Sequence, residues 1–217
     1  MPRWQRMKTL LVIDSSARAN RSTTRALTQR FSATWKARFG DSAVIHRDLG
    51  ASPPPAIDEA WIASAFGEPN EETPAALAAS ETFIAELFQA DAIVIGAPMY
   101  NFGMPSALKA YFDQIVRVGR TFAFTEDPEN PYQPLIPSKP VVLITSKGSG
   151  EYEAGGMLET LNFLEPHLAT ILGFIGLGDI AYAKVAREEY KDEEWKRMVA
   201  EAEAKVDRLA GDLATAN

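Results

Sequence analysis

The chain has 217 residues, of which 46% are hydrophobic, and a formal net charge of −7. This length and composition predict one domain with a sizeable core, and the acidic balance argues against a nucleic-acid partner, which needs a basic face. Cysteine is absent and histidine occurs only twice, which excludes disulfides and thiol catalysis; we expect no metal site, and any redox chemistry requires a bound cofactor.

Residues 1–7 precede the first predicted strand, and we expect them to be disordered or extended. The first apolar run, residues 10–13, is shorter than the core of a signal peptide. No run reaches the ~20 apolar residues that a membrane-spanning helix needs. We therefore expect a cytoplasmic protein without a membrane partner.

Short apolar runs alternate with segments of helical periodicity along the whole chain. Strands are predicted at 9–14, 43–49, 92–97, 141–146 and 179–183, and the apolar character of 9–14 and 92–97 predicts that these two are buried. Helices are predicted from the end of the polar loop 15–22 to Gly40, and over 72–89, 105–118, 157–172 and 195–213.

Apolar spacing also predicts which side of each helix is buried. Pro166 favours a kink in the helix 157–172. Residues 57–73 predict a partly helical connection, and residues 187–197 a solvated helix face. In the helix 72–89 we expect five side chains to point inward: Leu77, Phe83, Ile84, Leu87 and Phe88.

This alternation predicts an α/β fold in which helices cover both faces of a five-stranded parallel sheet. A flavodoxin-like three-layer sandwich with strand order 2-1-3-4-5 fits the spacing, with residues 1–217 as one domain. In such sheets ligands bind beyond the carboxyl ends of the strands. The loops 15–24, 99–104 and 147–156 should therefore meet at one crevice.

The first of these loops offers hydroxyl groups at the beginning of a helix: Ser16, Ser22, Thr23 and Thr24. With the positive end of the helix dipole they can hold a phosphate without a lysine, and ordinary helix capping is the alternative. The neighbouring Arg18 and Arg21 either add charge or lie in solvent. Neither the GxGxxG nor the GxxxxGK[ST] pattern is present in this loop.

The second and third loops carry the remaining candidate residues. After Pro98, the residues Met99, Tyr100, Asn101 and Phe102 offer large side chains and backbone N–H groups around a turn, which suits a flat ring system. The alternative is that these aromatic residues only close the core. The loop 147–156 contains four glycines, which either allow close approach of a ligand or serve a flexible connection.

Residues 97–122, APMYNFGMPSALKAYFDQIVRVGRTF, resemble the central signature of the FMN-dependent NADH azoreductases, also called FMN-dependent NADH:quinone oxidoreductases. The resemblance continues through VIDSS, HRDL, VVLITSKG and LGFIGLGDI and covers most of the chain. It implies bound FMN, with the phosphate at Ser16, Ser22, Thr23 and Thr24 and the flavin ring at 98–102. The flavin's pyrimidine edge would lie against Ser146, Lys147, Gly148 and Ser149.

The resemblance also implies an activity. NADH or NADPH would pass a hydride to FMN and leave, and a quinone or azo compound would then be reduced in the same place. The chemistry would be carried by FMN, so that no catalytic side chain is expected, while Lys147 and the Gly148 amide would stabilise negative charge on the ring. The family usually has Ser-Arg-Gly-Gly where this chain has Ser-Lys-Gly-Ser at 146–149, and only arginine has a planar fork.

Two further features concern partners. Residues 121–140 form an inserted proline-rich loop in which prolines recur every third residue from Pro128 to Pro140, the period of a polyproline II helix. A ligand for another domain is one interpretation; we favour an extended loop whose Phe122, Phe124 and Tyr132 wall the crevice, in this chain or against a second subunit. The wide apolar arc of the helix 105–118 favours a homodimer. Alternatives to the enzyme are a flavodoxin-type electron carrier, a general NAD(P)H:FMN reductase and a flavin-free scaffold.

Overall fold

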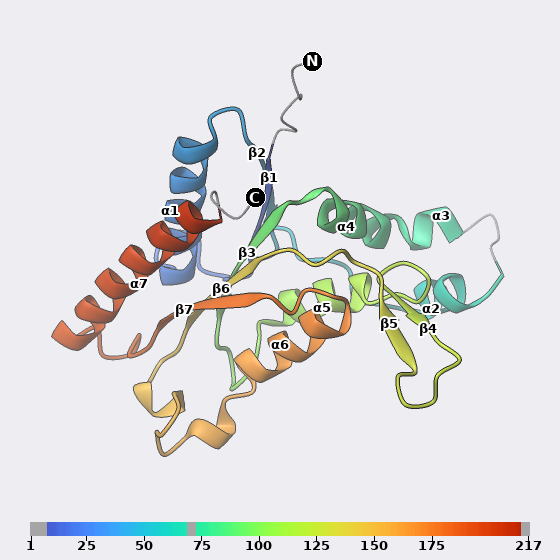
Figure 1. Ribbon diagram of the computed structural model, residues 1–217. Helices are drawn as coiled ribbons and strands as arrows, with labels where there is room; N and C mark the ends of the chain where they lie inside the picture. Colours follow the sequence, from blue (N-terminus) through green and yellow to red (C-terminus); the bar gives the residue numbers. More distant parts are fainter. Residues whose placement is uncertain (1–7, 69–72, 214–217) are drawn as a thin grey trace.

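The computed structural model describes residues 8–68 and 73–213 (Figure 1). The prediction for residues 1–7 lies outside this part of the chain. Five parallel strands form the central sheet in the order β2-β1-β3-β6-β7, which confirms the predicted order once the strands of the sheet alone are counted. The strands are β1 Thr9–Asp14, β2 Ala43–Asp48, β3 Ala92–Pro98, β6 Val141–Ser146 and β7 Ile180–Val185.

The three inner strands, β1, β3 and β6, are buried at every position because helices cover both faces of the sheet. Side chains of β1 alternate between the two faces: Leu10 and Val12 belong to one core cluster, and Leu11 and Ile13 to the other. The register pairs Leu10 with Ala92 and Ile93 with Val141, so the carboxyl ends of β1, β3 and β6 lie side by side.

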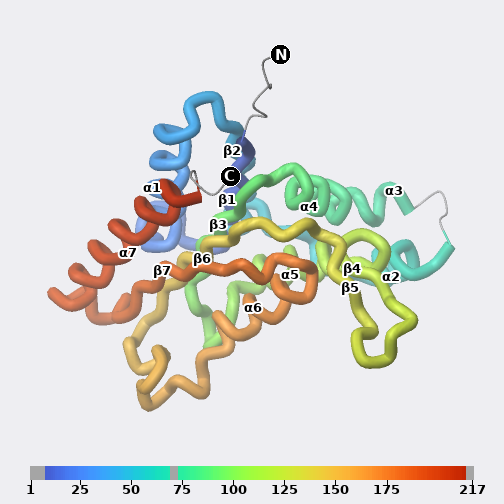
Figure 2. Tube along the Cα trace, viewed as in Figure 1, coloured from blue at the N-terminus to red at the C-terminus, as the bar shows by residue number. Residues whose placement is uncertain are grey.

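Two layers of helices enclose the sheet (Figures 1 and 2). On one face α1 and α7 lie side by side, and Phe31 and Trp35 of α1 pack with Val206 of α7. On the other face lie α4, α5 and α6, whose buried leucines share one cluster. The bounds are α1 Thr23–Phe39, α4 Ala78–Gln89, α5 Ser106–Ile115, α6 Leu164–Phe174 and α7 Glu193–Asp212.

Short elements complete the described chain. The helices α2 Glu59–Phe66 and α3 Thr73–Ala76 precede α4, and the 3-10 turns η1 Gly150–Tyr152 and η2 Glu159–Leu161 precede α6. The strands β4 Phe122–Phe124 and β5 Tyr132–Pro134 pair as an antiparallel hairpin. Among the described residues, no helix combines the length and apolar character needed to cross a bilayer.

Two predicted helices were wrong in their limits. The helix expected over 72–89 is divided at Leu77 into α3 and α4, and Phe88 is 42% exposed rather than inward-facing. The helix expected from residue 157 begins only at Leu164, so Pro166 lies in its first turn, where proline is accommodated without a kink.

The proline-rich segment contains a hairpin that was not predicted, and the interpretation that we did not favour, polyproline II, is not observed. The segment folds back on itself as the β4–β5 hairpin instead of extending as polyproline II. The rings of Phe122 and Tyr132 pack on Phe174, the last residue of α6, with centroids 4.9 and 5.3 Å away. The crevice lies beyond the other end of α6, where Phe163 N donates to Phe102 O. Within one chain, therefore, the hairpin does not wall the crevice.

Candidate functional site

Three loops meet at the carboxyl ends of β1, β3 and β6 and enclose a crevice of about 260 Å³. This volume is close to the lower limit of small-molecule sites, ~300–1,000 Å³. Eight of the thirteen predicted residues line the crevice; Thr24, Asn101, Phe102, Lys147 and Ser149 do not. The lining residues are Ser16, Arg18, Arg21, Ser22, Thr23, Pro98, Met99, Tyr100, Ser146, Gly148, Glu188 and Glu189.

The first loop presents hydroxyl groups and a helix N-terminus to the crevice. Ser22 is the N-cap of α1, and its Oγ accepts a hydrogen bond from Arg25 N at 3.3 Å and lies 3.1 Å from Thr24 Oγ1. Thr24 itself is fully buried beneath this turn. Capping and anion binding are compatible here, because the first turn of a helix has several N–H groups without intrahelical partners and a positive dipole end. Arg18 and Arg21 add positive charge to the same wall.

The second loop is a tight turn with an unusual backbone. Tyr100 and Gly103 exchange two backbone hydrogen bonds of 2.9 and 3.1 Å, and between them Asn101 and Phe102 have φ values of 47° and 72°. The left-handed conformation costs a residue other than glycine roughly 1–2 kcal/mol, and such strain persists where the surroundings impose it. The backbone hydrogen bonds between Tyr100 and Gly103 hold Asn101 and Phe102 in this conformation.

The same turn is connected to the first loop. Ala17 N donates a hydrogen bond of 3.2 Å to the Tyr100 hydroxyl. Met99 N donates to Ser146 O at 2.8 Å, which joins the turn to the end of β6. Outside the crevice, the half-exposed ring of Phe102 contacts Tyr152, with centroids 6.2 Å apart. All three loops are thus held together by specific hydrogen bonds and ring contacts.

Lys147 is oriented differently from the sequence expectation. Its side chain is fully buried, and its ammonium group forms ion pairs with Glu165 of α6 and Glu153 of the following loop. Burial alone would raise the pKa of Glu165, but the hydrogen bond and charge of Lys147 and the Thr145 hydroxyl lower it below its usual value. The charge of Lys147 is therefore used inside the protein and does not line the crevice.

Ser149 adopts an ordinary extended backbone with φ −120°, so it needs no glycine-only conformation. Its hydroxyl accepts a hydrogen bond from Glu151 N at 3.2 Å and caps η1. Gly148, by contrast, has a close neighbour, because a Cβ placed there would lie within 2.8 Å of the Glu189 carboxyl carbon. A side chain at position 148 would therefore require the exposed Glu189 side chain to move, and the serine at 149 is tolerated.

Sequence reasoning missed Glu188 and Glu189. Their backbone N–H groups donate to the carbonyl groups of Lys147 and Gly148 at 3.1 and 3.2 Å, so this segment extends the pairing between β6 and β7. We had assigned residues 187–197 to a solvated helix face, and the acidic pair gave no sign of a ligand site. Their position directly after the last strand was the available signal, because ligands in such sheets bind beyond the carboxyl ends of the strands.

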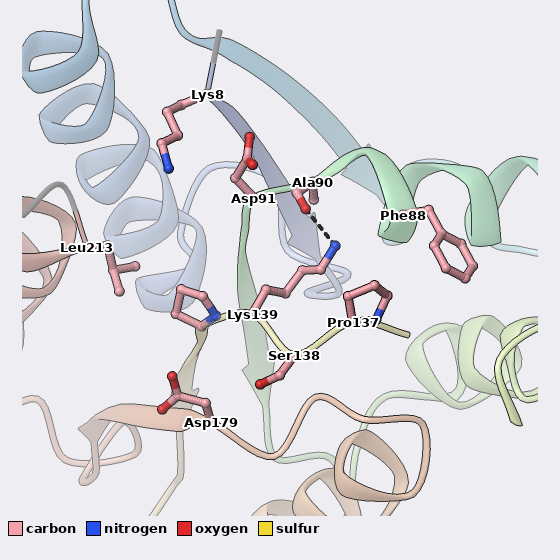
Figure 3. Close-up of a pocket in the computed structure, with 10 residues that line it drawn as sticks. Lys8, Phe88, Ala90, Asp91, Pro137, Ser138, Lys139, Asp179 and Leu213 are labelled. Atoms are coloured by element: carbon pink, nitrogen blue, oxygen red, sulfur yellow. Dashed lines mark hydrogen bonds between the residues drawn. The ribbon is translucent and has the colours of Figure 1, made fainter. Parts of the chain in front are cut away.

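A larger cavity, about 550 Å³, lies at the opposite end of the sheet, by the amino ends of the strands (Figure 3). Its most buried charged group, Lys139, donates hydrogen bonds of 2.6 Å to the carbonyl groups of Leu87 and Ala90 at the end of α4. Lys139 thus caps a helix C-terminus, where positive charge is favourable. Size alone does not identify the functional site, and the convergent loops favour the smaller crevice.

Comparison with known proteins agrees with this geometry. Residues 8–208 match a protein family described as having a flavodoxin-like fold. The FMN-dependent NADH:quinone oxidoreductase of Opitutus terrae is 48% identical over 215 residues, which cover 97% of this chain and 100% of that protein. The FMN-dependent NADH:quinone oxidoreductase 1 of Trichormus variabilis is 44% identical and covers 92% of this chain and 94% of its own.

Solved structures show the same fold at lower sequence identity. An azoreductase from Bacillus anthracis strain Sterne has a TM-score of 0.84 at 21% identity, covering 95% of this chain and 100% of its own. An FMN-dependent NADH-azoreductase from Bacillus anthracis strain Ames Ancestor, solved in complex with FMN, has a TM-score of 0.83 at 20% identity, covering 96% and 100%. The chain therefore belongs to the flavodoxin-like family of FMN-dependent NADH:quinone oxidoreductases.

Proposed function

We propose that this protein is an FMN-dependent oxidoreductase that uses NADH or NADPH to reduce quinones and azo compounds by two-electron transfer in a ping-pong sequence. The observation that carries the proposal is the convergence of the loops after β1, β3 and β6 on one crevice. Relatives named FMN-dependent NADH:quinone oxidoreductase, up to 48% identical to this chain, support it.

The residues of the crevice suit FMN because they offer two different environments next to each other. Ser16, Ser22 and Thr23 at the N-terminus of α1 suit a phosphate, and Thr24 supports them from below. The turn from Met99 to Phe102 suits a flat ring, with N–H groups at its edge and large side chains against its face. Ser146, the Gly148 amide and the backbone of Lys147 and Ser149 would face the pyrimidine edge.

Bound FMN supplies the capacity to accept a hydride and to return it to an acceptor. The protein positions the reactants and excludes water, and no side chain of the chain needs to titrate. Phe102 of the second loop and Phe163, whose N–H donates to Phe102 O, are 45% and 56% accessible and suit stacking against flat donors and acceptors. This arrangement explains how one site serves NADH and a planar acceptor in turn.

We further propose a homodimer. The hairpin exposes Phe124 and Tyr132, which are 66% and 50% accessible, on the same side of the sheet as α5 and α6. In a dimer these rings would be covered, and the hairpin of one subunit would reach the crevice of the other. Sedimentation velocity measures the assembly directly. Use of NADH or NADPH also favours the expected cytoplasmic location.

The activity is tested with purified protein in three steps. The protein should bind FMN, lose the visible absorbance of the oxidised flavin on anaerobic addition of NADH, and regain it on addition of a quinone or an azo dye. Steady-state kinetics with NADH and NADPH then give the donor preference. A protein that neither binds FMN nor oxidises NADH would refute the proposal, and a stable one-electron form with negligible NADH oxidation would favour the carrier.

A further inference from the structure

We infer that Arg25, together with Asp48 and Gly50, positions the loop that binds the FMN phosphate. The inference rests on the proposed function, and it assigns a role to the HRDL motif at residues 46–49, which ligand binding alone leaves unexplained. Arg25 does not line the crevice. It acts on the crevice through the backbone of Ser16.

Arg25 uses its whole guanidinium group to hydrogen-bond two partners, and its Nη1 also lies 3.8 Å from the buried carboxylate of Asp14. Nη1 and Nη2 donate to the two carboxylate oxygens of Asp48 at 2.6 and 2.5 Å. Nε and Nη2 donate to the carbonyl oxygen of Ser16 at 3.3 and 2.8 Å. Arg25 is 8% exposed, so these bonds lie largely out of water. A planar fork with this geometry is specific to arginine, because the ammonium group of lysine cannot bond two partners in parallel.

This arrangement fixes one peptide plane in the phosphate loop. The described peptides are trans, so the C=O of Ser16 and the N–H of Ala17 point in opposite directions. The carbonyl oxygen is held by Arg25, and the N–H donates to the Tyr100 hydroxyl at 3.2 Å. With both ends of the plane bonded, the side chain of Ser16 is directed to the crevice, which it lines.

Gly50 allows this arrangement to form. Asp48 Oδ1 accepts hydrogen bonds from Gly50 N and Ala51 N at 3.1 and 3.0 Å, which brings Gly50 against the carbonyl group of Ser16. A Cβ at position 50 would overlap the Ser16 carbonyl oxygen and lie 2.6 Å from Arg25 Nη2. The backbone of Gly50 has no positive φ, so alanine would introduce this clash without backbone strain.

The test compares FMN with riboflavin, which has the same ring and ribityl chain but no phosphate. Dissociation constants of both flavins are measured by fluorescence quenching and calorimetry on apoprotein of wild type, Arg25→Lys, Asp48→Asn and Gly50→Ala. We expect each variant to bind FMN about tenfold or more weakly, as for loss of one charge-assisted hydrogen bond, and riboflavin within about twofold of wild type. Gly173→Ala is the matched control, because a Cβ there meets nothing within 4 Å.

Circular dichroism and urea unfolding establish that each variant is folded. If Arg25→Lys does not fold, Asp48→Asn still tests the inference, because asparagine has nearly the same shape as aspartate. Equal loss of FMN and riboflavin affinity, or no loss of either, in folded variants overturns the inference while wild-type FMN binding leaves the proposed function intact. A wild-type protein that binds neither flavin overturns both.

Discussion

Replacing Lys147 by methionine should expose the cost of a buried carboxylate. The Lys147 side chain has no exposed surface and that of Glu165 is 8% exposed, so the substitution removes the counter-charge of Glu165 while nearly preserving the packed volume. Breaking a buried ion pair by removing one partner costs about 3–5 kcal/mol. Glu165 keeps its hydrogen bond of 2.8 Å from the Thr145 hydroxyl, and Glu153 keeps Lys184 at 3.3 Å. We therefore expect the lower end, about 3 kcal/mol.

The loss should depend on pH with a defined sign. In the wild type the pKa of Glu165 lies below its usual value, so its contribution is present at neutral pH and is lost as the pH falls through the folded-state pKa. Without Lys147, burial dominates and raises the pKa of Glu165, and the folded variant gains stability as the carboxylate takes up a proton. The difference between wild type and variant should shrink as the pH falls from neutral toward the acid range.

Urea unfolding at a series of pH values measures both effects. A loss of about 3 kcal/mol corresponds to a decrease in Tm of roughly 6–12 °C for a domain of this size. Lys184→Met is the control, because this exposed lysine pairs with the same Glu153 and should cost less than about 1 kcal/mol. The double variant Lys147→Met, Glu165→Gln should recover part of the loss. A cost below about 1 kcal/mol for Lys147→Met, independent of pH, would refute the reasoning.

Three further outcomes are expected. Tyr100→Phe loses only the hydrogen bond from Ala17 N, worth about 1 kcal/mol, so kcat should stay within about fivefold of wild type; complete loss of turnover in the FMN-loaded variant would contradict this. Phe102→Gly relieves the left-handed backbone strain but increases the conformational entropy of the unfolded chain. The free energy of unfolding measured in urea should therefore change by less than about 1 kcal/mol, while the KM for the acceptor rises. The hydrogen bond from Arg187 lowers the pKa of Asp192 to about 2; the loss of Tm caused by Asp192→Ala should therefore be constant near neutral pH and shrink as the pH falls toward 2.

The sheet and its order were predictable because the three inner strands, β1, β3 and β6, are short and mainly apolar runs at regular spacing. β1 was predicted to the residue, and Gly40, with φ 54°, ends α1 as expected. The loops at the carboxyl ends followed from topology alone, and eight of their candidate residues line the crevice. Family resemblance then gave the cofactor, which composition and periodicity could not.

Tertiary contacts account for what the sequence did not predict. Helical periodicity extends through Leu77, yet the helix is interrupted there. Phe88 matched the apolar side of its helix, but it lies at the mouth of the larger cavity and is 42% exposed. The orientation of Lys147 depends on Glu165, which lies 18 positions further along the chain on another element. No local sequence pattern predicts such an ion pair. In the hairpin β4–β5, Phe122 pairs with Pro134. Proline disfavours strands, so the sequence of this segment does not predict the hairpin.

The hydrogen bond between Ala17 N and the Tyr100 hydroxyl couples the two halves of the crevice. One half suits an anion and the other a flat ring, and the bond sets the span between them to a fixed length. A ligand must then match this span as well as the chemistry at each end. The crevice would therefore select ligands by the length of the linker between ring and phosphate. A flavin analogue with a shorter or longer linker would bind with only one of its two ends in place.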